Sequence, residues 1–430
     1  RLKTGCGCGC QNAGMHGLIQ PNAASPLLPP TIKALGWTSF LTDLSSEAIY
    51  PLLPTFLLRE LGGSTLFIGL IDGLATALAA VVRLPAGALS DRFGRRRLVL
   101  FGYGLSAVIR PLMGLVATPF EALLVRASDR IGKGIRGAPR DALVTDLVQP
   151  AIRGRAFGHI RALDHAGAAL GPVVAMLFLF FFPGEERRLF LLTILPGFLT
   201  LAVLYRLVHD PAPRLPPPAR VSVPVRLCRQ QSLLLWSVGI WALGASSEQF
   251  LLLRVADLGV PLVLIPLVWL GMSLAKSGAA LAAGRLADHW HPRRALATGW
   301  LVFAAAYGGL AVCTQTMTAV AMVMLVGVAY GMIEPAERSL VALLSPAGHH
   351  GGAFGWYTLV QGLLALPAGL LTGWLWQQGP HGVTWALAIT AVLSTVACLS
   401  LTRPLVATGL RPGSDQVAIR ERNPAHEPPV

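Results

Sequence analysis

Twelve apolar stretches, each about the length of a membrane-spanning helix, follow one another along this chain of 430 residues. An α-helix rises about 1.5 Å per residue, so roughly 20 apolar residues cross the hydrocarbon core of a bilayer. Because lipid cannot hydrogen-bond to the backbone, the sequence predicts an all-α integral membrane protein. The stretches cover residues 33–58, 66–90, 98–117, 120–142, 160–182, 188–208, 233–254, 262–286, 295–314, 318–344, 355–376 and 382–402.

The amino-acid composition favours a membrane protein over a nucleic-acid-binding one. Hydrophobic residues make up 53% of the chain and charged residues 13%, whereas a typical soluble domain has about 25% charged residues. The net charge of +14 could indicate a nucleic-acid partner, but the charges fall in short segments between the apolar stretches, as membrane topology requires. We therefore expect the lipid bilayer, and no nucleic acid, as a partner.

The apolar stretches form two sets of six, separated by a segment rich in Pro and Arg. This segment, residues 210–232, is predicted to be a polar cytoplasmic linker. It separates an N-terminal six-helix bundle at 31–209 from a C-terminal one at 233–403. Residues 1–30 lack the apolar core of a signal peptide. We expect a disordered or mis-assigned tail there and a disordered cytoplasmic tail at 404–430.

Arginine residues concentrate in the loops on one side of the predicted membrane. By the positive-inside rule this side is cytoplasmic, so we expect both termini in the cytoplasm and the protein in a plasma membrane, the inner membrane of a bacterium. The arginines on this side are Arg92, Arg95, Arg96, Arg97, Arg153, Arg155, Arg214, Arg220, Arg226, Arg229, Arg293, Arg294, Arg411, Arg420 and Arg422.

The two halves repeat each other at a constant offset of 197 residues. Internal repeats of this kind are typical of transporters with a pseudo-two-fold axis and a binding site between the halves, near the bilayer midplane. The repeated pairs are Gly87 and Gly284, Asp91 and Asp288, Arg96 and Arg293, Gly134 and Gly331, and the segments 153–158 and 350–355.

The loop after the second stretch carries a family resemblance. Its pattern, Gly-x3-Asp-Arg-x-Gly-Arg-Arg, is matched by Gly87, Asp91, Arg92, Gly94, Arg95 and Arg96. Through this motif the chain resembles the major facilitator superfamily over nearly its whole length. The resemblance implies twelve helices in two pseudo-symmetric bundles. It also implies an electrostatic latch at this loop, with Asp146 as a partner and Asp288 in a weaker second copy.

This loop motif leaves two interpretations open. Asp91 could accept hydrogen bonds from a helix N-terminus of the other half, which would make the loop a latch that stabilises an outward-open state. In the alternative, the arginines only set the orientation of the protein, and the salt bridges of the loop contribute about 0–1 kcal/mol each.

Two further motifs resemble those of the same family. In RIGKGIR, Arg130 and Gly134 match the fourth-span motif, whereas Lys133 and Arg136 depart from it; the longer run DRIGKGIRGAPRDAL resembles a prokaryotic subgroup. The fifth-span motif, associated with proton-coupled exporters, implies export, although small residues at this spacing also serve ordinary close packing. It is matched by Gly158, Gly167, Gly171 and Pro172.

The fourth stretch carries cations at helical spacing. We call Arg126, Arg130, Lys133 and Arg140 the basic stripe, because their spacing places them on one face of a helix. An uncompensated cation at bilayer depth costs about 2.5–3.5 kcal/mol, so the stripe must face a wet cavity or carboxylates. It would bind an anionic group of the substrate, or be neutralised internally. The predicted cavity residues are Arg126, Asp129, Arg130, Lys133, Arg136 and Glu334.

Three acids, Asp43, Glu47 and Glu248, are the candidates for proton coupling. Asp43 and Glu47 lie four residues apart on one face of the first helix, at about the depth of the basic stripe. Glu248 has the matching place in the second half. These carboxylates would either titrate as the cavity opens to each side, and so couple a proton gradient to transport, or act as permanent counter-ions of the stripe.

Together these features predict a monomeric secondary active transporter that works by alternating access. The favoured reaction is proton-coupled antiport, which would export a small amphiphilic or anionic organic solute. Uptake or uniport of an organic anion is one alternative, and a membrane sensor that keeps the scaffold without transport is another. The sequence contains no Walker loop or nucleophile elbow. We therefore predict no enzyme, no cofactor and no metal site, with the proton gradient as the energy source.

Overall fold

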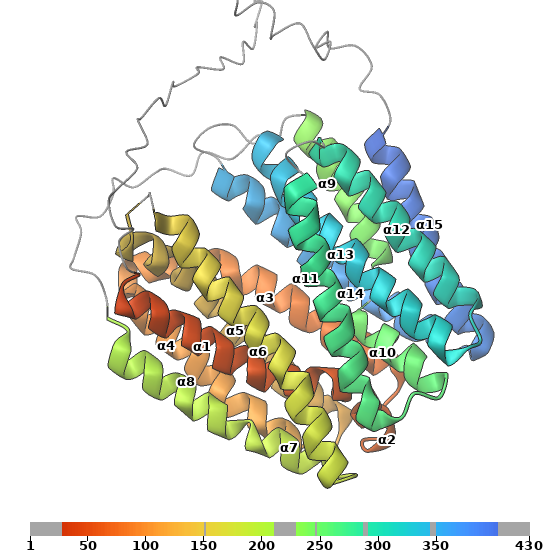
Figure 1. The fold of residues 1–430 in the computed structure, drawn as a ribbon, viewed down its shortest axis with the longest axis horizontal. Coiled ribbons are helices and arrows are strands. Elements are labelled where there is room, and N and C mark those ends of the chain that lie inside the picture. Colours follow the sequence, from red (N-terminus) through yellow and green to blue (C-terminus); the bar gives the residue numbers. More distant parts are fainter. Residues whose placement is uncertain are drawn as a thin grey trace, which may run out of the picture.

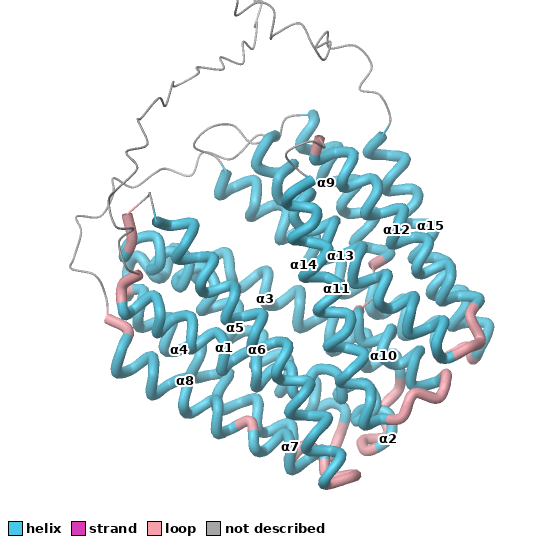
Figure 2. Tube along the Cα trace, in the orientation of Figure 1, coloured by secondary structure: helices cyan, strands magenta, loops and turns pink. Residues whose placement is uncertain are grey.

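A computed structural model describes residues 28–149, 152–209, 229–245, 247–286, 291–344 and 350–402. These residues form α-helices and short 3-10 helices joined by brief loops, and the described chain contains no strand (Figure 2). The prediction of an all-helical protein is confirmed. The predicted tails and linker lie almost entirely outside the described residues, as do several of the arginines used to predict the orientation.

The first half runs from α1 to α8. Its elements are α1 (Pro30–Ile49), η1 (Tyr50–Leu52), α2 (Leu53–Arg59), α3 (Thr65–Phe93), α4 (Arg95–Ile109), η2 (Arg110–Gly114), α5 (Pro119–Leu147), α6 (Arg153–Phe181), α7 (Glu186–Leu192) and α8 (Ile194–Leu207).

The second half runs from α9 to α15. Its elements are α9 (Arg229–Gly244), α10 (Glu248–Asp257), η4 (Leu262–Leu264), α11 (Ile265–Leu286), α12 (Pro292–Val312), α13 (Thr316–Leu344), α14 (His350–Trp376) and α15 (Pro380–Thr402).

Every predicted apolar stretch coincides with one or more of these helices. Among the described residues, eight helical segments are long and apolar enough to cross a membrane. The other four stretches correspond to α1–η1–α2, α4–η2, α5 and α9–α10. Proline accounts for the 3-10 segments η1 and η2, because Pro51 and Pro111 stand at their second positions. Proline has no backbone N–H to donate to a continuing α-helix. The helix α5 instead carries charged residues along its length.

The two halves pack along two pairs of helices. The helix α3 lies against α14, and α6 lies against α11. Glycine permits the first contact, since a Cβ atom on Gly69 would overlap the backbone of Gly369, and the reverse also holds. Near the end of the same pair, the Thr65 hydroxyl donates a hydrogen bond of 2.9 Å to the Gly373 carbonyl.

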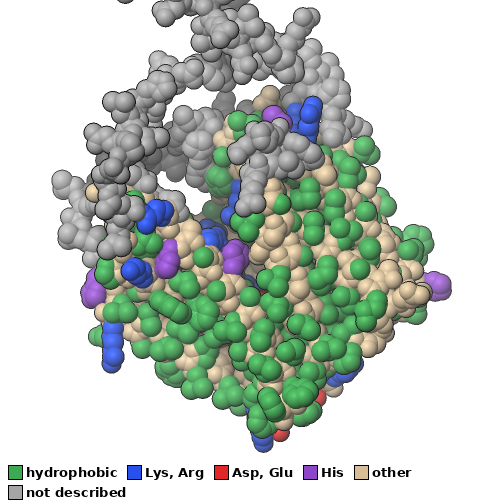
Figure 3. Space-filling model, viewed as in Figure 1, with side chains coloured by type: hydrophobic (Ala, Val, Ile, Leu, Met, Phe, Trp, Pro, Cys, Tyr) green, Lys and Arg blue, Asp and Glu red, His purple; other side chains and the backbone are tan. Residues whose placement is uncertain are grey.

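The halves meet at one end of the molecule and separate toward the other. They meet where α2 lies beside α10, and they spread toward the side where α1 begins and α15 ends, which we call the tail side (Figure 1). Hydrophobic side chains cover the flanks of the helices, while Lys and Arg gather at the ends and in a hollow between the halves on the tail side (Figure 3). Large exposed apolar residues such as Phe101, Phe180 and Trp236 suit a lipid-facing surface.

Candidate functional site

A cavity of about 410 Å³ lies between the halves on the tail side, within the range of roughly 300–1,000 Å³ common for small-molecule sites. Five helices of the first half, α1, α3, α4, α5 and α6, line the cavity. The second half contributes Thr358, Gln361 and Gly362 of α14. Among the described residues that line it, all the charged ones come from the first half. Six cations and three carboxylates are present, namely Asp43, Arg83, Arg130, Lys133, Arg136, Arg140, Asp141, Arg161 and Asp164.

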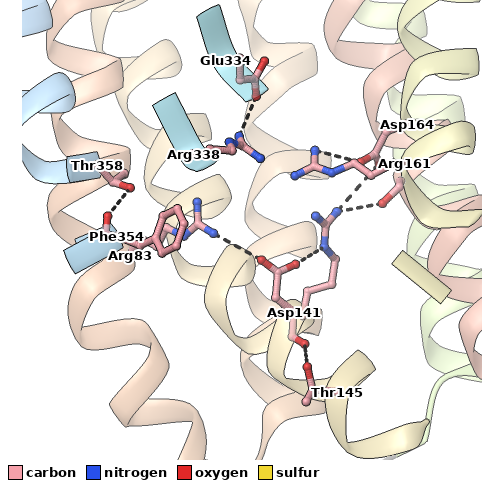
Figure 4. Close-up of polar contacts among 11 residues, drawn as sticks. Arg83, Asp141, Thr145, Arg161, Asp164, Glu334, Arg338, Phe354 and Thr358 are labelled. Atoms are coloured by element: carbon pink, nitrogen blue, oxygen red, sulfur yellow. Dashed lines mark hydrogen bonds and ion pairs between the residues drawn. The ribbon is translucent and has the colours of Figure 1, made fainter. Parts of the chain in front are cut away.

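Two of these carboxylates are each shared by two arginines (Figure 4). Because the side chains of Arg83 and Arg161 are half-exposed, we call this part the mouth of the cavity. Asp141 lies 3.3 Å from Arg83 and 3.5 Å from Arg140. Asp164 lies 3.9 Å from Arg140 and 3.6 Å from Arg161. The side chains of Arg83 and Arg161 are half-exposed, so water screens their charge.

The basic stripe divides between the cavity and the interior of the first half. Arg130, Lys133 and Arg136 line the cavity as predicted, whereas Arg126 and Asp129 do not. Asp129 stands one position before Arg130, which turns its side chain by about 100° around the helix axis, away from the cavity. Arg126 lies one helical turn beyond the cavity, toward the side where the halves meet. Arg126 and Asp129, which were predicted to line the cavity, are therefore not among the residues that line this one.

Arg126 and Asp129 instead belong to a buried ion network. Asp129 lies 3.0 Å from Arg110 and 3.9 Å from Arg126, and Arg126 lies 3.8 Å from Asp72. Arg126 also stacks over the ring of Tyr50 at 5.1 Å. Sequence reasoning missed Asp72 and Arg110, although each is a charged residue within an apolar stretch, which is itself a functional signal in a membrane protein.

The two acids of the first helix have different surroundings. Asp43 lines the cavity with the stripe, as predicted. Glu47 does not, because its carboxylate accepts a hydrogen bond of 2.8 Å from the indole N–H of Trp269 on α11, in the other half. A spacing of four residues places two side chains on one helix face, but a full turn of about 5.4 Å separates them along the axis. Glu47 therefore reaches a different neighbour.

A second polar contact between the halves lies near Glu248. The hydroxyl of Ser247 donates a hydrogen bond of 2.6 Å to Asp72 of α3. Glu248 itself is the first residue of α10 and half-buried. A helix N-terminus favours a carboxylate, because the N–H groups of the first turn point toward it.

The acids of α13 lie outside the cavity. Glu334, predicted to line it, instead pairs with Arg338 at 2.6 Å and with Lys276 at 3.9 Å. Its carboxylate points toward the guanidinium group of Arg338, one turn further along the same helix (Figure 4). Glu337 is buried and accepts hydrogen bonds from Tyr357 at 2.6 Å and from Gln361, a cavity residue, at 3.0 Å.

The predicted latch loop joins α3 to α4. Gly94 makes the turn with φ of +89°, a conformation that favours glycine. Arg95 pairs with Asp146 at the end of α5 at 2.6 Å, the partner that the resemblance implied. Arg96 donates to the carbonyl groups of Val208 and Tyr205 at the end of α8.

The structure shows no close side-chain contact at the other described residues of the predicted latch. Arg92 is exposed, and a Cβ atom on Gly87 would make only an ordinary contact of 3.6 Å with Ala138. The side chain of Asp91 and the whole of Asp288 lie outside the described residues.

The glycines of the fifth-span motif place α6 against α1. A Cβ atom on Gly167 would overlap the carbonyl of Phe40, and one on Gly171 would lie 2.7 Å from the carbonyl of Leu44. Pro172 follows within the helix. Gly158 has no neighbour within 4 Å of such an atom. Two of the three glycines thus serve helix packing directly.

A family model described as Major Facilitator Superfamily matches residues 35–366, and a second match covers residues 250–426. The chain belongs to the major facilitator superfamily. This membership makes the facilitator an integral membrane transporter of small molecules, and not an enzyme.

The facilitator resembles several known proteins, two of those named here along most of its length and one along about a third. It is 30% identical over 380 residues to an uncharacterized MFS-type transporter of Methanocaldococcus jannaschii, which covers 86% of this chain and 95% of that protein. It is 29% identical over 136 residues to the multidrug resistance protein MdtH of Yersinia pestis, covering 32% of this chain and 34% of that one. A solved bacterial homolog of the human lysosomal transporter Spinster, inward-facing and unoccupied, matches with a TM-score of 0.72 at 17% identity and covers 86% and 95% of the two chains.

Proposed function

We propose that this facilitator is a proton-coupled antiporter that exports a small amphiphilic or anionic organic solute. It would work by alternating access, with the two halves rocking around the cavity. The tail side would face the cytoplasm of a bacterium, so that the conformation described here is open to the inside. The arginines near Arg95 and Arg155 on this side support that orientation.

The excess of cations in the cavity carries this proposal. Six cations against three carboxylates leave a net positive charge in a space bounded by both halves. An anion that entered from the tail side would be attracted to the first half and would contact α14 of the second. Ionisable residues inside a membrane protein are costly unless they face water or partners, so their concentration here favours a substrate pathway.

Proton coupling would act through the hydrogen bond between Glu47 and Trp269. This contact joins the halves in the present conformation. Protonation of Glu47 would remove the charge from the hydrogen bond, and charge-assisted hydrogen bonds are roughly twice as strong as neutral ones. A proton taken up by Glu47 from outside the cell would therefore favour the conformation in which the halves separate at the end opposite the tail side.

Reconstituted flux tests the proposal. Proteoliposomes loaded with a fluorescent organic anion should release it faster when the external pH is below the internal pH. Glu47→Gln, which cannot change its charge, should remove this dependence on the gradient. Anion flux that does not depend on the pH gradient would favour a uniporter. Binding of the anion without any flux would favour the sensor.

Uptake by proton–anion symport is a second candidate, favoured by the position of Asp43. This carboxylate shares the cavity with Lys133 and Arg130, so protonating it would raise the net positive charge and strengthen the binding of an anion. Under the same acidic exterior, symport predicts accumulation of the anion inside the vesicles rather than its release. The direction of flux therefore separates the two candidates.

A further inference from the structure

Three cations on α5 face the cavity without an ion pair. Arg130, Lys133 and Arg136 are spaced by three residues, and none of them has a carboxylate within salt-bridge distance among the described residues. The remaining arginines of the cavity share the carboxylates of Asp141 and Asp164.

The three side chains differ in how they are held. Arg136 is buried, donates a hydrogen bond of 2.7 Å to the Ser106 hydroxyl and stacks over the Tyr103 ring at 4.5 Å. These neutral partners hold the guanidinium group, and no carboxylate of the described residues lies within ion-pair distance of it. Arg130 has a buried Nε with no hydrogen-bond partner, and Lys133 is exposed to the cavity.

The charges in this part of the cavity do not balance. Of the carboxylates among the described lining residues, Asp43 is the one that the mouth arginines do not engage. Three cations without an ion pair against this one carboxylate leave an excess of two positive charges along this part of the cavity wall. Ionisable groups within a membrane protein are costly unless they face water or a partner. Guanidinium and ammonium groups both bind multiply charged oxyanions, and Arg does so with a planar fork of donors.

We propose that the substrate carries a head group with two negative charges, a phosphate monoester or a dicarboxylate, bound by Arg130, Lys133 and Arg136. This inference rests on the proposed function. The neutral Thr358 and Gln361 on the opposite wall would accommodate the uncharged remainder of the solute, so recognition is concentrated at one end.

Titration calorimetry on the purified full-length protein tests the inference with matched probes. Phenyl phosphate is compared with its methyl ester, and succinate with monomethyl succinate, so each pair differs by one negative charge. We expect the dianion to bind about 10- to 100-fold more tightly than its ester, as charge-assisted hydrogen bonds predict. Discrimination in the phosphate pair alone identifies a phosphate monoester as the head group, and discrimination in the succinate pair alone identifies a dicarboxylate.

Variants connect the preference to the α5 cations. Lys133→Gln should reduce the discrimination by about tenfold, and Lys133→Arg, which keeps the charge, should retain it. Arg188→Gln is the control, because Arg188 is exposed and pairs with Glu185 far from the cavity. Equal affinity within both pairs, or no binding of any probe, would overturn the inference.

The flux assay keeps the two proposals distinguishable. Transport of an anion in a protein that binds both members of each pair equally would overturn only the dianionic head group. Selective binding of dianions without any flux would overturn the transport proposal and leave the binding site intact.

Discussion

At the scale of single residues, the interior of the first half depends on a pair of opposite charges. Arg110 and Asp129 lie 3.0 Å apart, and their side chains are only 9% and 6% exposed. Arg110 also donates to the carbonyl of Thr42 and the hydroxyl of Ser45 at 2.9 and 3.0 Å. Because these donors and acceptors are buried, each group depends on its partners to offset the loss of water.

Removing one charge of this pair should therefore destabilise the protein strongly. We expect Asp129→Asn to cost about 3–5 kcal/mol, because it leaves Arg110 buried without a counter-ion. Thermal unfolding of the purified variant measures the loss. Arg188→Gln breaks an exposed pair with Glu185 and should change stability by about 0–1 kcal/mol. Similar losses in the two variants would contradict a special role for the buried pair.

At the scale of helices, glycine determines how closely α6 approaches α1. Gly167 faces the backbone of Phe40, whereas Gly158, on the same helix, faces open space. Glycine lowers the stability of an isolated helix, so its use at position 167 is explained by the contact that it allows. No such contact accounts for Gly158.

These two glycines form a matched pair for mutation. Gly167→Ala places a methyl group against the Phe40 carbonyl, and we expect a loss of about 1–3 kcal/mol through overpacking. Gly158→Ala should be neutral, or stabilising by up to about 1 kcal/mol, since alanine is the better helix former. Thermal unfolding of both variants under one set of conditions checks the difference. A destabilising Gly158→Ala together with a tolerated Gly167→Ala would contradict this explanation.

At the scale of the whole molecule, polar contacts hold the halves together away from the tail side. Trp269 donates to Glu47 at 2.8 Å and Ser247 donates to Asp72 at 2.6 Å, each across the interface. In the alternating-access cycle that we propose, these bonds would break in the other conformation. Their strength therefore sets part of the balance between the two conformations.

Removing the indole donor should shift that balance. We expect Trp269→Phe to shift the conformational equilibrium by about 10- to 100-fold toward separation of α2 from α10, because a hydrogen bond to a charged group contributes about 1.5–3 kcal/mol. Distances between spin labels on the two helices report the shift.

Two further variants test the same contact. Trp385→Phe, at an exposed tryptophan on α15, should leave the distance distribution unchanged. If Glu47 and Trp269 act through this bond, combining Glu47→Gln with Trp269→Phe should add little to either single change. An unchanged distance distribution in Trp269→Phe would show that this hydrogen bond does not hold α2 against α10.

Sequence patterns alone predicted the helices, the position of the loop between the second and third apolar stretches, and the cations along one helix. Apolar length and helical spacing act locally, so they can be recognised without the fold. Only the tertiary structure decided the partners: Asp129 with Arg110, Glu47 with Trp269 and not with the basic stripe. Spacing along one helix sets the directions of its side chains relative to one another, but the packing of the neighbouring helices decides what each one meets.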